Sequence, residues 1–236
     1  MKWRAEWCKN QKMSARIKSD YITGEIGMKR IVKRIVKRTG MAIAAAVLLI
    51  ALIFLGYLGM NQMGPFAKKE TPEWVEEVWL TPNSYSRPMK PLKEVNNIVI
   101  HYVANPGTSA KNNRNYFENL KSTRLTKASS HFIVGLEGEI LECVPLTEIS
   151  YCSNDRNGDT VAIEVCHPDE SGQFNRETYQ SVVRLTAWLC LHYGLDEEDV
   201  IRHYDVTGKN CPKYYVEHED AWEQLKADVA AAMGQN

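Results

Sequence analysis

Three side chains of metal-binding type lie far apart in this sequence and can meet only through folding. His101 lies inside the apolar run 98–102 (IVIHY), whereas His203 and Cys211 lie eight residues apart in the segment 201–212 (IRHYDVTGKNCP), which has the glycine and proline of a loop. Two imidazoles and one thiolate form a ligand set for zinc and leave the fourth tetrahedral position to water, as catalytic zinc sites do. Taken singly, His101 also fits a hydrogen-bonded core histidine, and Cys211 fits an incidental cysteine in a polar loop.

Two charged side chains can complete a catalytic centre around such a metal. Glu164 lies in the apolar run 161–166 (VAIEVC), where a carboxylate is either paired or catalytic, because an unpaired buried charge is too costly. A carboxylate beside a metal-bound water can act as a general base. Lys209, between the second histidine and the cysteine, can stabilise an oxyanion. A salt-bridged sheet residue is the alternative for Glu164.

The segments around these residues alternate between strand and helix patterns. Strands are expected at 97–103, 131–136, 139–144 and 161–166, and helices at 112–122, 177–193 and 219–233. Glu137-Gly138 favours a hairpin between the second and third strands. Asn175 can cap the long helix, and Gly194 can end it. The pattern predicts an α/β fold with a mixed central β-sheet flanked by helices.

Composition excludes several classes of protein. With 44% hydrophobic and 25% charged residues the chain is neither disordered nor fibrous, and six cysteines are too few for a disulfide-stabilised miniprotein. The formal net charge of zero results from two oppositely charged segments that cancel. Residues 1–40 hold twelve basic against three acidic residues, a net charge of +9, and the remainder holds 17 against 26, a net charge of −9. Such asymmetry indicates a boundary between two environments.

An uncharged segment of 21 residues, 40–60, lies at this boundary. As a helix it would span about 30 Å, the hydrocarbon thickness of a bilayer, and it lacks the polar face that a core helix keeps. Six basic residues within 29–38 precede it, whereas Lys68 and Lys69 follow it. The positive-inside rule predicts an N-terminal transmembrane helix, with 1–39 as a cytoplasmic basic tail and the remainder outside the cell membrane.

Three alternatives concern this N-terminal region. A cleaved signal peptide would have a shorter apolar core and an A-x-A site, so an uncleaved signal anchor is favoured. Met28 is an alternative translation start. The basic stripe is most simply a topogenic signal with affinity for anionic lipids, and nucleic-acid binding is the weaker interpretation, so we expect no nucleic-acid partner.

Residues 61–93 hold five of the nine prolines and no sustained apolar period. This composition predicts a Pro-rich stalk with a short helix around 73–80. Residues 94–236 are a suitable length for one domain with its own core. We expect this domain to be a monomer.

In the motifs around His101, Glu164 and residues 201–212, the segment 95–229 resembles the zinc-dependent N-acetylmuramoyl-L-alanine amidases of the amidase-2 type. That family shares its fold with phage lysozyme-like amidases and peptidoglycan recognition proteins. The similar motifs are the strand histidine IVIHY, the run SSHFIVGLEGEI, the strand VAIEVC and the terminal IRHYDVTGKNCP. The last has its histidine, lysine and cysteine in the family's order and spacing. The resemblance implies that 94–236 is a zinc amidase domain.

Carried over to the matching positions, the resemblance implies that one zinc ion per chain is held by His101, His203 and Cys211. Glu164 would activate the zinc-bound water, and Lys209 would hold the tetrahedral oxyanion. The implied reaction is hydrolysis of the amide between the lactyl group of N-acetylmuramic acid and the L-alanine of the stem peptide. The implied substrate is peptidoglycan.

The chain departs from the family pattern at two places. Tyr151-Cys152 stands where many relatives have Trp-His, which puts a substrate contact of the family in doubt. Ser130 stands where phage relatives with a catalytic tyrosine place that residue, so no tyrosine role is carried over.

The segment just before the Glu164 strand supplies the predicted substrate-binding residues. These are Asn154, Arg156 and Asn157, whose polar side chains can line a substrate groove. A solvated loop is the alternative interpretation.

Four cysteines remain outside the predicted ligand set and the cytoplasmic tail: Cys143, Cys152, Cys166 and Cys190. An extracellular setting permits disulfides, and four cysteines allow three pairings. Buried reduced thiols are the favoured interpretation.

Two other classes of function compete with a membrane-anchored enzyme. A recognition module on the same fold would bind muropeptides without cutting them, and loss of a zinc ligand would indicate it. An anchored structural protein would need none of the five site residues. All five are present, which favours the hydrolase.

Overall fold

The structure of the chain, a computed structural model, describes residues 71–234. The predicted cytoplasmic tail, the predicted transmembrane helix and residues 61–70 of the predicted stalk lie outside the described residues. Within 71–234, no helix combines the length and the apolar character needed to cross a membrane.

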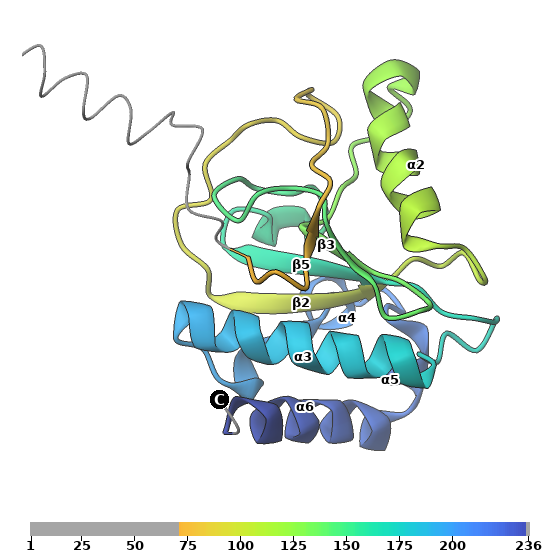
Figure 1. Ribbon diagram of the computed structural model, residues 1–236, viewed down its shortest axis with the longest axis vertical. Helices are drawn as coiled ribbons and strands as arrows, with labels where there is room; N and C mark the ends of the chain where they lie inside the picture. The colour runs from red at the N-terminus through yellow and green to blue at the C-terminus, as the bar shows by residue number, and fades with distance from the viewer. Residues whose placement is uncertain (1–70, 235–236) are drawn as a thin grey trace, which may run out of the picture. The chain divides into compact units, whose positions relative to one another are not determined.

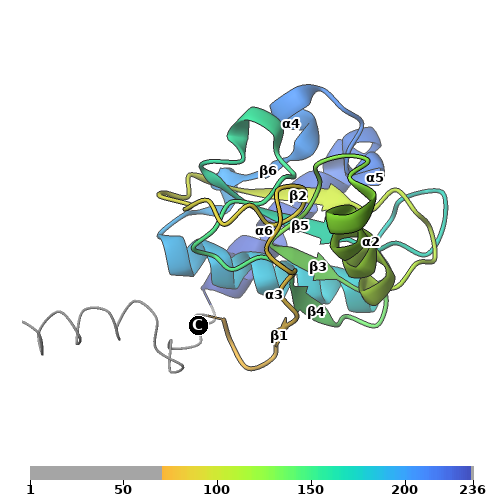
Figure 2. The same cartoon turned by 90° about the horizontal axis from the view of Figure 1, so that it is seen from above.

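Six strands form one mixed sheet in the order β1-β4-β3-β5-β2-β6 (Figure 1). The strands are β1 (Glu76–Glu77), β2 (Asn97–Tyr102), β3 (Phe132–Val134), β4 (Ile140–Glu142), β5 (Thr160–Val165) and β6 (Val200–Arg202). Strands β3 and β4 pair antiparallel, as the hairpin pattern predicts, and the other neighbours pair parallel. Figure 2 shows β6 at one edge of the sheet and β1 at the other. The predicted mixed central sheet is confirmed.

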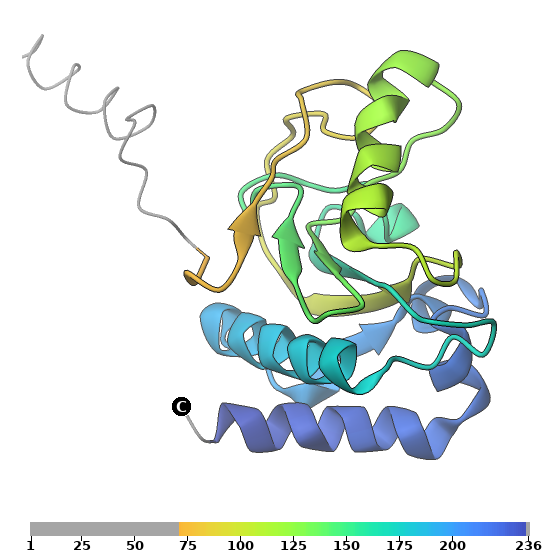
Figure 3. The same ribbon diagram turned by 45° about the vertical axis from the view of Figure 1, so that its right-hand side comes forward.

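Helices cover both faces of the sheet (Figures 1 and 3). The longer ones are α2 (Ala110–Thr123), α3 (Arg176–Tyr193) and α6 (Glu219–Met233), and the short ones are α4 (His203–Thr207), α5 (Lys213–Glu217) and the 3₁₀ turns η1 (Asn154–Arg156) and η2 (Glu197–Asp199). Helices α3 and α6 cover one face, here called the α3 face, and α2 covers the other, the α2 face. The ends of α3 are those predicted: Asn175 Oδ1 accepts from the N–H of Thr178, and Gly194 is left-handed at φ 69°.

Alternating residues of the strands separate the two faces, because successive side chains of a strand point to opposite sides. In β3, Phe132 and Val134 join the larger apolar cluster, with α3 and α6, whereas Ile133 joins the smaller cluster, with α2. In β2, Ile98 and Ile100 belong to the larger cluster. His101, one position further along β2, therefore lies on the α2 face.

The segment 71–93 differs from the sequence-based expectation. The helix expected around 73–80 is wrong: Val75 and Leu80 are buried, and between them β1 pairs with β4. Further along, Arg87 forms a 2.7 Å ion pair with Glu148. Residues 71–93 therefore pack onto the same compact unit as the rest of the described chain, instead of standing apart as a stalk. Pro91 of this segment forms an isolated antiparallel bridge with Glu148.

Candidate active site

Two histidines and a cysteine, His101, His203 and Cys211, converge at the carboxyl end of β2. One potential ligand atom of each lies within 4.8 Å of those of the other two. Cys211 Sγ lies 3.9 Å from His101 Nδ1, and the two imidazole centroids are 4.5 Å apart. All three side chains are buried. The structure thus brings His101 together with His203 and Cys211, from which the sequence separates it by more than a hundred positions.

The geometry of α4 explains how His203 and Cys211 meet. Strand β6 pairs with β2, and His203 follows β6 directly as the first residue of α4. Gly208 ends α4 at φ 75°, a left-handed conformation that glycine adopts without strain. The returning chain is then fixed because the N–H of Tyr204 donates to the carbonyl oxygen of Cys211 over 2.9 Å. The sequence indicated a loop here, and the short helix inside it was not predicted.

Glu164 lies directly beside His101, because β5 and β2 pair in parallel with these two residues in register. Its Oε1 accepts a hydrogen bond from the Cys152 thiol over 3.6 Å. Its Oε2 is buried and has no hydrogen-bond partner within the described part of the chain. Burial raises the pKa of Glu164 to about 7, although the thiol hydrogen bond and the charge of Lys209 act in the opposite direction. A carboxyl group in this state can accept and return a proton near neutral pH.

The electrostatics around the three converging residues match a site for a cation. Burial holds the pKa of His101 well below its usual value, and the charges of His203 and Lys209 lower it further. Burial and the charge of Lys209 also lower the pKa of His203. Both imidazoles are therefore neutral at pH 7, as metal ligands must be. Burial raises the pKa of the Cys211 thiol to about 12, so only a nearby cation would make it a thiolate at that pH.

Two buried nitrogen atoms at this point have no hydrogen-bond partner among the described residues, His101 Nε2 and His203 Nδ1. Buried polar atoms of this kind are rare and point to a missing partner such as an ion. The imidazole and thiol donors could hold a metal ion.

Lys209 is exposed in the loop between α4 and Cys211. Its positive charge lowers the pKa values of His101, His203 and Glu164. An exposed ammonium group that acts electrostatically on a buried centre is available to a bound substrate.

Sequence reasoning assigned no role to Cys152. The structure places it beside Glu164, and His101, Cys152 and Glu164 form a second group whose ligand atoms lie within 4.8 Å of one another. One sequence signal could have pointed to Cys152. Many members of the amidase-2 family have Trp-His at the positions of Tyr151 and Cys152. Cys143, Cys152, Cys166 and Cys190 are all free thiols, in agreement with the favoured interpretation.

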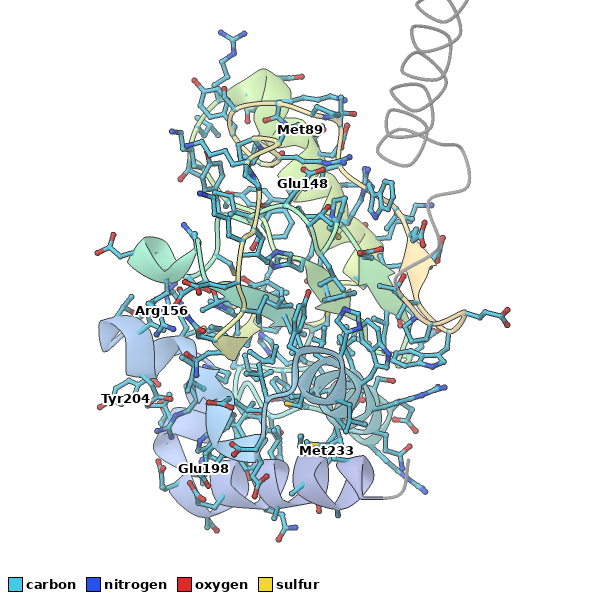
Figure 4. All side chains as sticks on the ribbon, turned by 90° about the vertical axis from the view of Figure 1, so that its left-hand side faces the viewer. Met89, Glu148, Arg156, Glu198, Tyr204 and Met233 are labelled. Atoms are coloured by element: carbon cyan, nitrogen blue, oxygen red, sulfur yellow. The ribbon has the colours of Figure 1, made fainter. Side chains whose placement is uncertain are left out.

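The three predicted substrate-binding residues lie in and next to η1, and only Asn154 reaches the site. Its Oδ1 lies 2.9 Å from His203 Nε2. Arg156 bonds to Asp159 and to the side chain of Asn97 instead. Asn157 Oδ1 accepts from two backbone N–H groups of its own loop. Figure 4 shows Arg156 of η1 and Tyr204 of α4 on the same side of the domain. Substrate contact by these three residues stays a prediction.

Residues 91–214 match the N-acetylmuramoyl-L-alanine amidase family, Amidase_2, over more than half of the chain. The chain belongs to this family. The matched segment contains all of the site residues described above, and the resemblance inferred from the motifs is confirmed.

Curated members of the amidase family give the same result. The chain is 34% identical over 165 residues to N-acetylmuramoyl-L-alanine amidase CwlL of Bacillus licheniformis, covering 64% of this chain and 45% of that protein. It is 33% identical over 172 residues to amidase BlyA of Bacillus subtilis, with the same coverage. The chain therefore matches slightly less than half the length of these relatives.

Solved structures agree on the fold. The catalytic domain of XlyA is 25% identical and superposes with a TM-score of 0.55, covering 66% of this chain and 98% of that one. The PlyG catalytic domain, at 20% identity, superposes with a TM-score of 0.57 over 67% of this chain and 94% of that one. The mixed sheet with helices on both faces is thus the amidase fold.

Proposed function

We propose that this chain is a zinc-dependent peptidoglycan hydrolase. It cleaves the amide between the lactyl group of N-acetylmuramic acid and the L-alanine of the stem peptide. The observation that carries the proposal is the convergence of His101, His203 and Cys211 beside Glu164. Family membership and the names of the curated relatives support the same reaction.

The residues present fit one zinc ion. Two neutral imidazoles and a thiol are donors that zinc accepts, and three protein ligands are typical of a catalytic rather than a structural site. The partnerless nitrogens of His101 and His203 are accounted for if an ion lies between them. When bound, zinc polarises the scissile carbonyl and lowers the pKa of a coordinated water from about 15.7 to about 7.

Glu164 moves the proton in the proposed reaction. Its carboxylate accepts a proton as the oxygen of water adds to the scissile carbonyl carbon. It then returns that proton to the amine nitrogen as the C–N bond breaks, which leaves a lactyl carboxyl group and a free L-alanine amino group. Burial raises the pKa of this carboxyl group above its usual value, which favours uptake of the proton in the first step.

Lys209 supplies positive charge to the carbonyl oxygen as negative charge develops there. Lys209 is exposed, whereas the other four groups are more buried. Removal of an oxyanion donor typically costs about 2.7–4 kcal/mol in catalysis. The contribution is to turnover rather than to metal binding.

We further propose that residues 40–60 anchor the enzyme in the cell membrane, with 1–39 in the cytoplasm and the catalytic domain outside it. The uncharged span and the basic residues that precede it support this arrangement. An anchored monomer of this kind reaches membrane-proximal peptidoglycan, which suits remodelling of the cell's own wall.

The test uses the 236-residue chain, purified in a mild detergent. Zinc content is measured by mass spectrometry, and products from isolated cell walls are analysed for new N-terminal L-alanine. We expect one zinc per chain and alanine release that stops with a chelator and returns with zinc. Glu164→Gln is the control, because it should bind zinc without releasing alanine.

Two outcomes would contradict the proposal. Zinc without products from any wall type would indicate a muropeptide-binding module. Folded protein without zinc would eliminate the metal centre.

A further inference from the structure

One hydrogen bond distinguishes the two nitrogens of His203. Its Nε2 lies 2.9 Å from Asn154 Oδ1, and its Nδ1 is buried without a partner among the described residues. An amide oxygen only accepts hydrogen bonds, so Nε2 carries the proton. A neutral imidazole protonated at Nε2 presents its lone pair at Nδ1. That lone pair belongs to the nitrogen whose buried position is otherwise unexplained.

Asn154 is held in place by an unusual backbone conformation. It begins η1 with φ 54°, in the left-handed region that most side chains avoid and asparagine tolerates. Left-handed positions of non-glycine residues occur where the surrounding structure imposes them, often at functional sites. The conformation turns the Asn154 amide towards α4, which contacts η1.

The loop that carries Asn154 is tied to the strand that carries His101. Asn157 Oδ1 accepts from the N–H groups of Cys152 and Ser153 at 3.0 and 2.7 Å and so closes the turn. Arg156 then donates to Asn97 Oδ1, at the start of β2, over 2.6 Å. His101 lies near the other end of β2. The loop is therefore fixed with respect to the first proposed ligand while it contacts the second.

We propose that Asn154 is a positioning residue for the metal centre: it holds His203 in the Nε2–H tautomer and thereby presents Nδ1 to an ion shared with His101 and Cys211. This inference rests on the proposed zinc site and deepens it. Histidine ligands in metal sites commonly donate their second N–H to an oxygen acceptor, and loss of that acceptor typically weakens metal binding 10–100-fold. The sequence suggested a substrate contact for Asn154, and the hydrogen bond gives it a role within the protein.

Two substitutions separate positioning from a structural role of the loop. Asn154→Gly removes the acceptor and accepts φ 54° more readily than asparagine, so the loop conformation is retained. Asn154→Asp keeps an acceptor oxygen and tolerates the same conformation. We expect zinc affinity, measured by competition with a chromophoric chelator, to fall 10–100-fold in the glycine variant and to stay at or above the wild-type value in the aspartate variant.

The tautomer is read directly from the metal-free chain. ¹⁵N NMR of the imidazoles at pH 8 should show His203 protonated on Nε2 in the wild type and in Asn154→Asp, and a mixture of tautomers in Asn154→Gly. Thermal unfolding of each metal-free variant checks that the fold is retained.

Three results would overturn the inference. These are a wild-type His203 protonated on Nδ1, unchanged zinc affinity in Asn154→Gly, or weaker affinity with an unchanged tautomer. Because the tautomer is measured without metal, a wild-type chain that bound no zinc would refute the proposed function separately.

Discussion

The two faces of the sheet are built from the same strands and differ in what they bury. The α3 face is closed by two long helices over an apolar cluster that includes Ile98, Ile100 and Leu185. The α2 face has a smaller apolar cluster. His101 and Glu164 lie on this face, and each has a buried polar atom without a hydrogen-bond partner among residues 71–234. In β2 the two kinds of residue alternate, so one strand contributes stability on one side and chemistry on the other. The desolvated groups of the site are tolerated because the opposite face stabilises their strands.

The largest expected effect is on the α2 face and concerns catalysis. Glu164→Gln removes the proton acceptor, and turnover should fall about 10²–10⁴-fold. Stability should be unchanged or higher, because a buried carboxyl group without a full set of partners is lost. Alanine release from cell walls and thermal unfolding are measured on the same preparation, with the exposed Glu94→Gln as the control. A marked loss of stability would contradict the separation of the two faces.

On the α3 face, Leu185→Ala should produce the opposite pattern. Leu185 is 0% exposed in α3, and its truncation should lower the free energy of unfolding by about 2–5 kcal/mol. Turnover per folded molecule should stay at the wild-type value. The matched control is Leu191→Ala, since Leu191 lies in the same helix at 48% exposure and its truncation should change stability by about 0.5 kcal/mol or less. Denaturant titration measures the free energy of unfolding of both variants. Equal losses in the two variants would refute the assignment of Leu185 to the stabilising core of the α3 face.

Lys209→Ala should lower turnover about 10²–10³-fold and leave zinc affinity nearly unchanged, because the exposed ammonium group acts on the oxyanion and not on the ion. Turnover and chelator competition are compared with the exposed Lys93→Ala. If zinc affinity fell as much as turnover, the oxyanion role would be wrong.

A further buried histidine, His131, sharpens the comparison, because both of its ring nitrogens have partners. Its Nδ1 accepts from the N–H of Ala162 over 3.1 Å, and its Nε2 lies 2.9 Å from the carbonyl oxygen of Glu148. Burial lowers the pKa of His131 from 6.5 to about 4, although the Glu148 carbonyl opposes this shift. A group whose pKa is lower in the folded state stabilises the fold above its unfolded pKa.

The stabilisation by His131 should therefore be complete above about pH 6.5 and be lost as the pH falls towards 4, by about 3 kcal/mol in total. Denaturant titrations between pH 7 and 4 are compared for the wild type and His131→Gln, and the variant should show the smaller decrease. Parallel curves would show that His131 does not cause the loss.

Sequence patterns were sufficient for the elements that position most of the site. The apolar runs of β2 and β5 and the capped helix α3 have clear periodicity or clear end signals, and the chain follows them. Strand β1 has only two residues, which is too short for any period to be detected, and the prolines of the surrounding segment 61–93 favoured a stalk. Helix α4 has five residues and ends at Gly208, so its pattern is that of a loop.

Within the site, residue types together with the family resemblance predicted the converging His101, His203 and Cys211, but spacing did not predict the partners of these groups. The contact between Asn154 and His203 joins residues 49 positions apart, and that between Cys152 and Glu164 depends on the path of one loop. Such contacts depend on tertiary packing, and no local pattern encodes them.

X-ray absorption at the zinc edge of the purified chain tests the central claim most directly. The account predicts a first shell with one sulfur at about 2.3 Å and two imidazole nitrogens at about 2.0–2.1 Å, completed by a light-atom ligand. In Cys211→Ser the sulfur should be absent. A wild-type shell with more than one sulfur, or with none, would contradict the account.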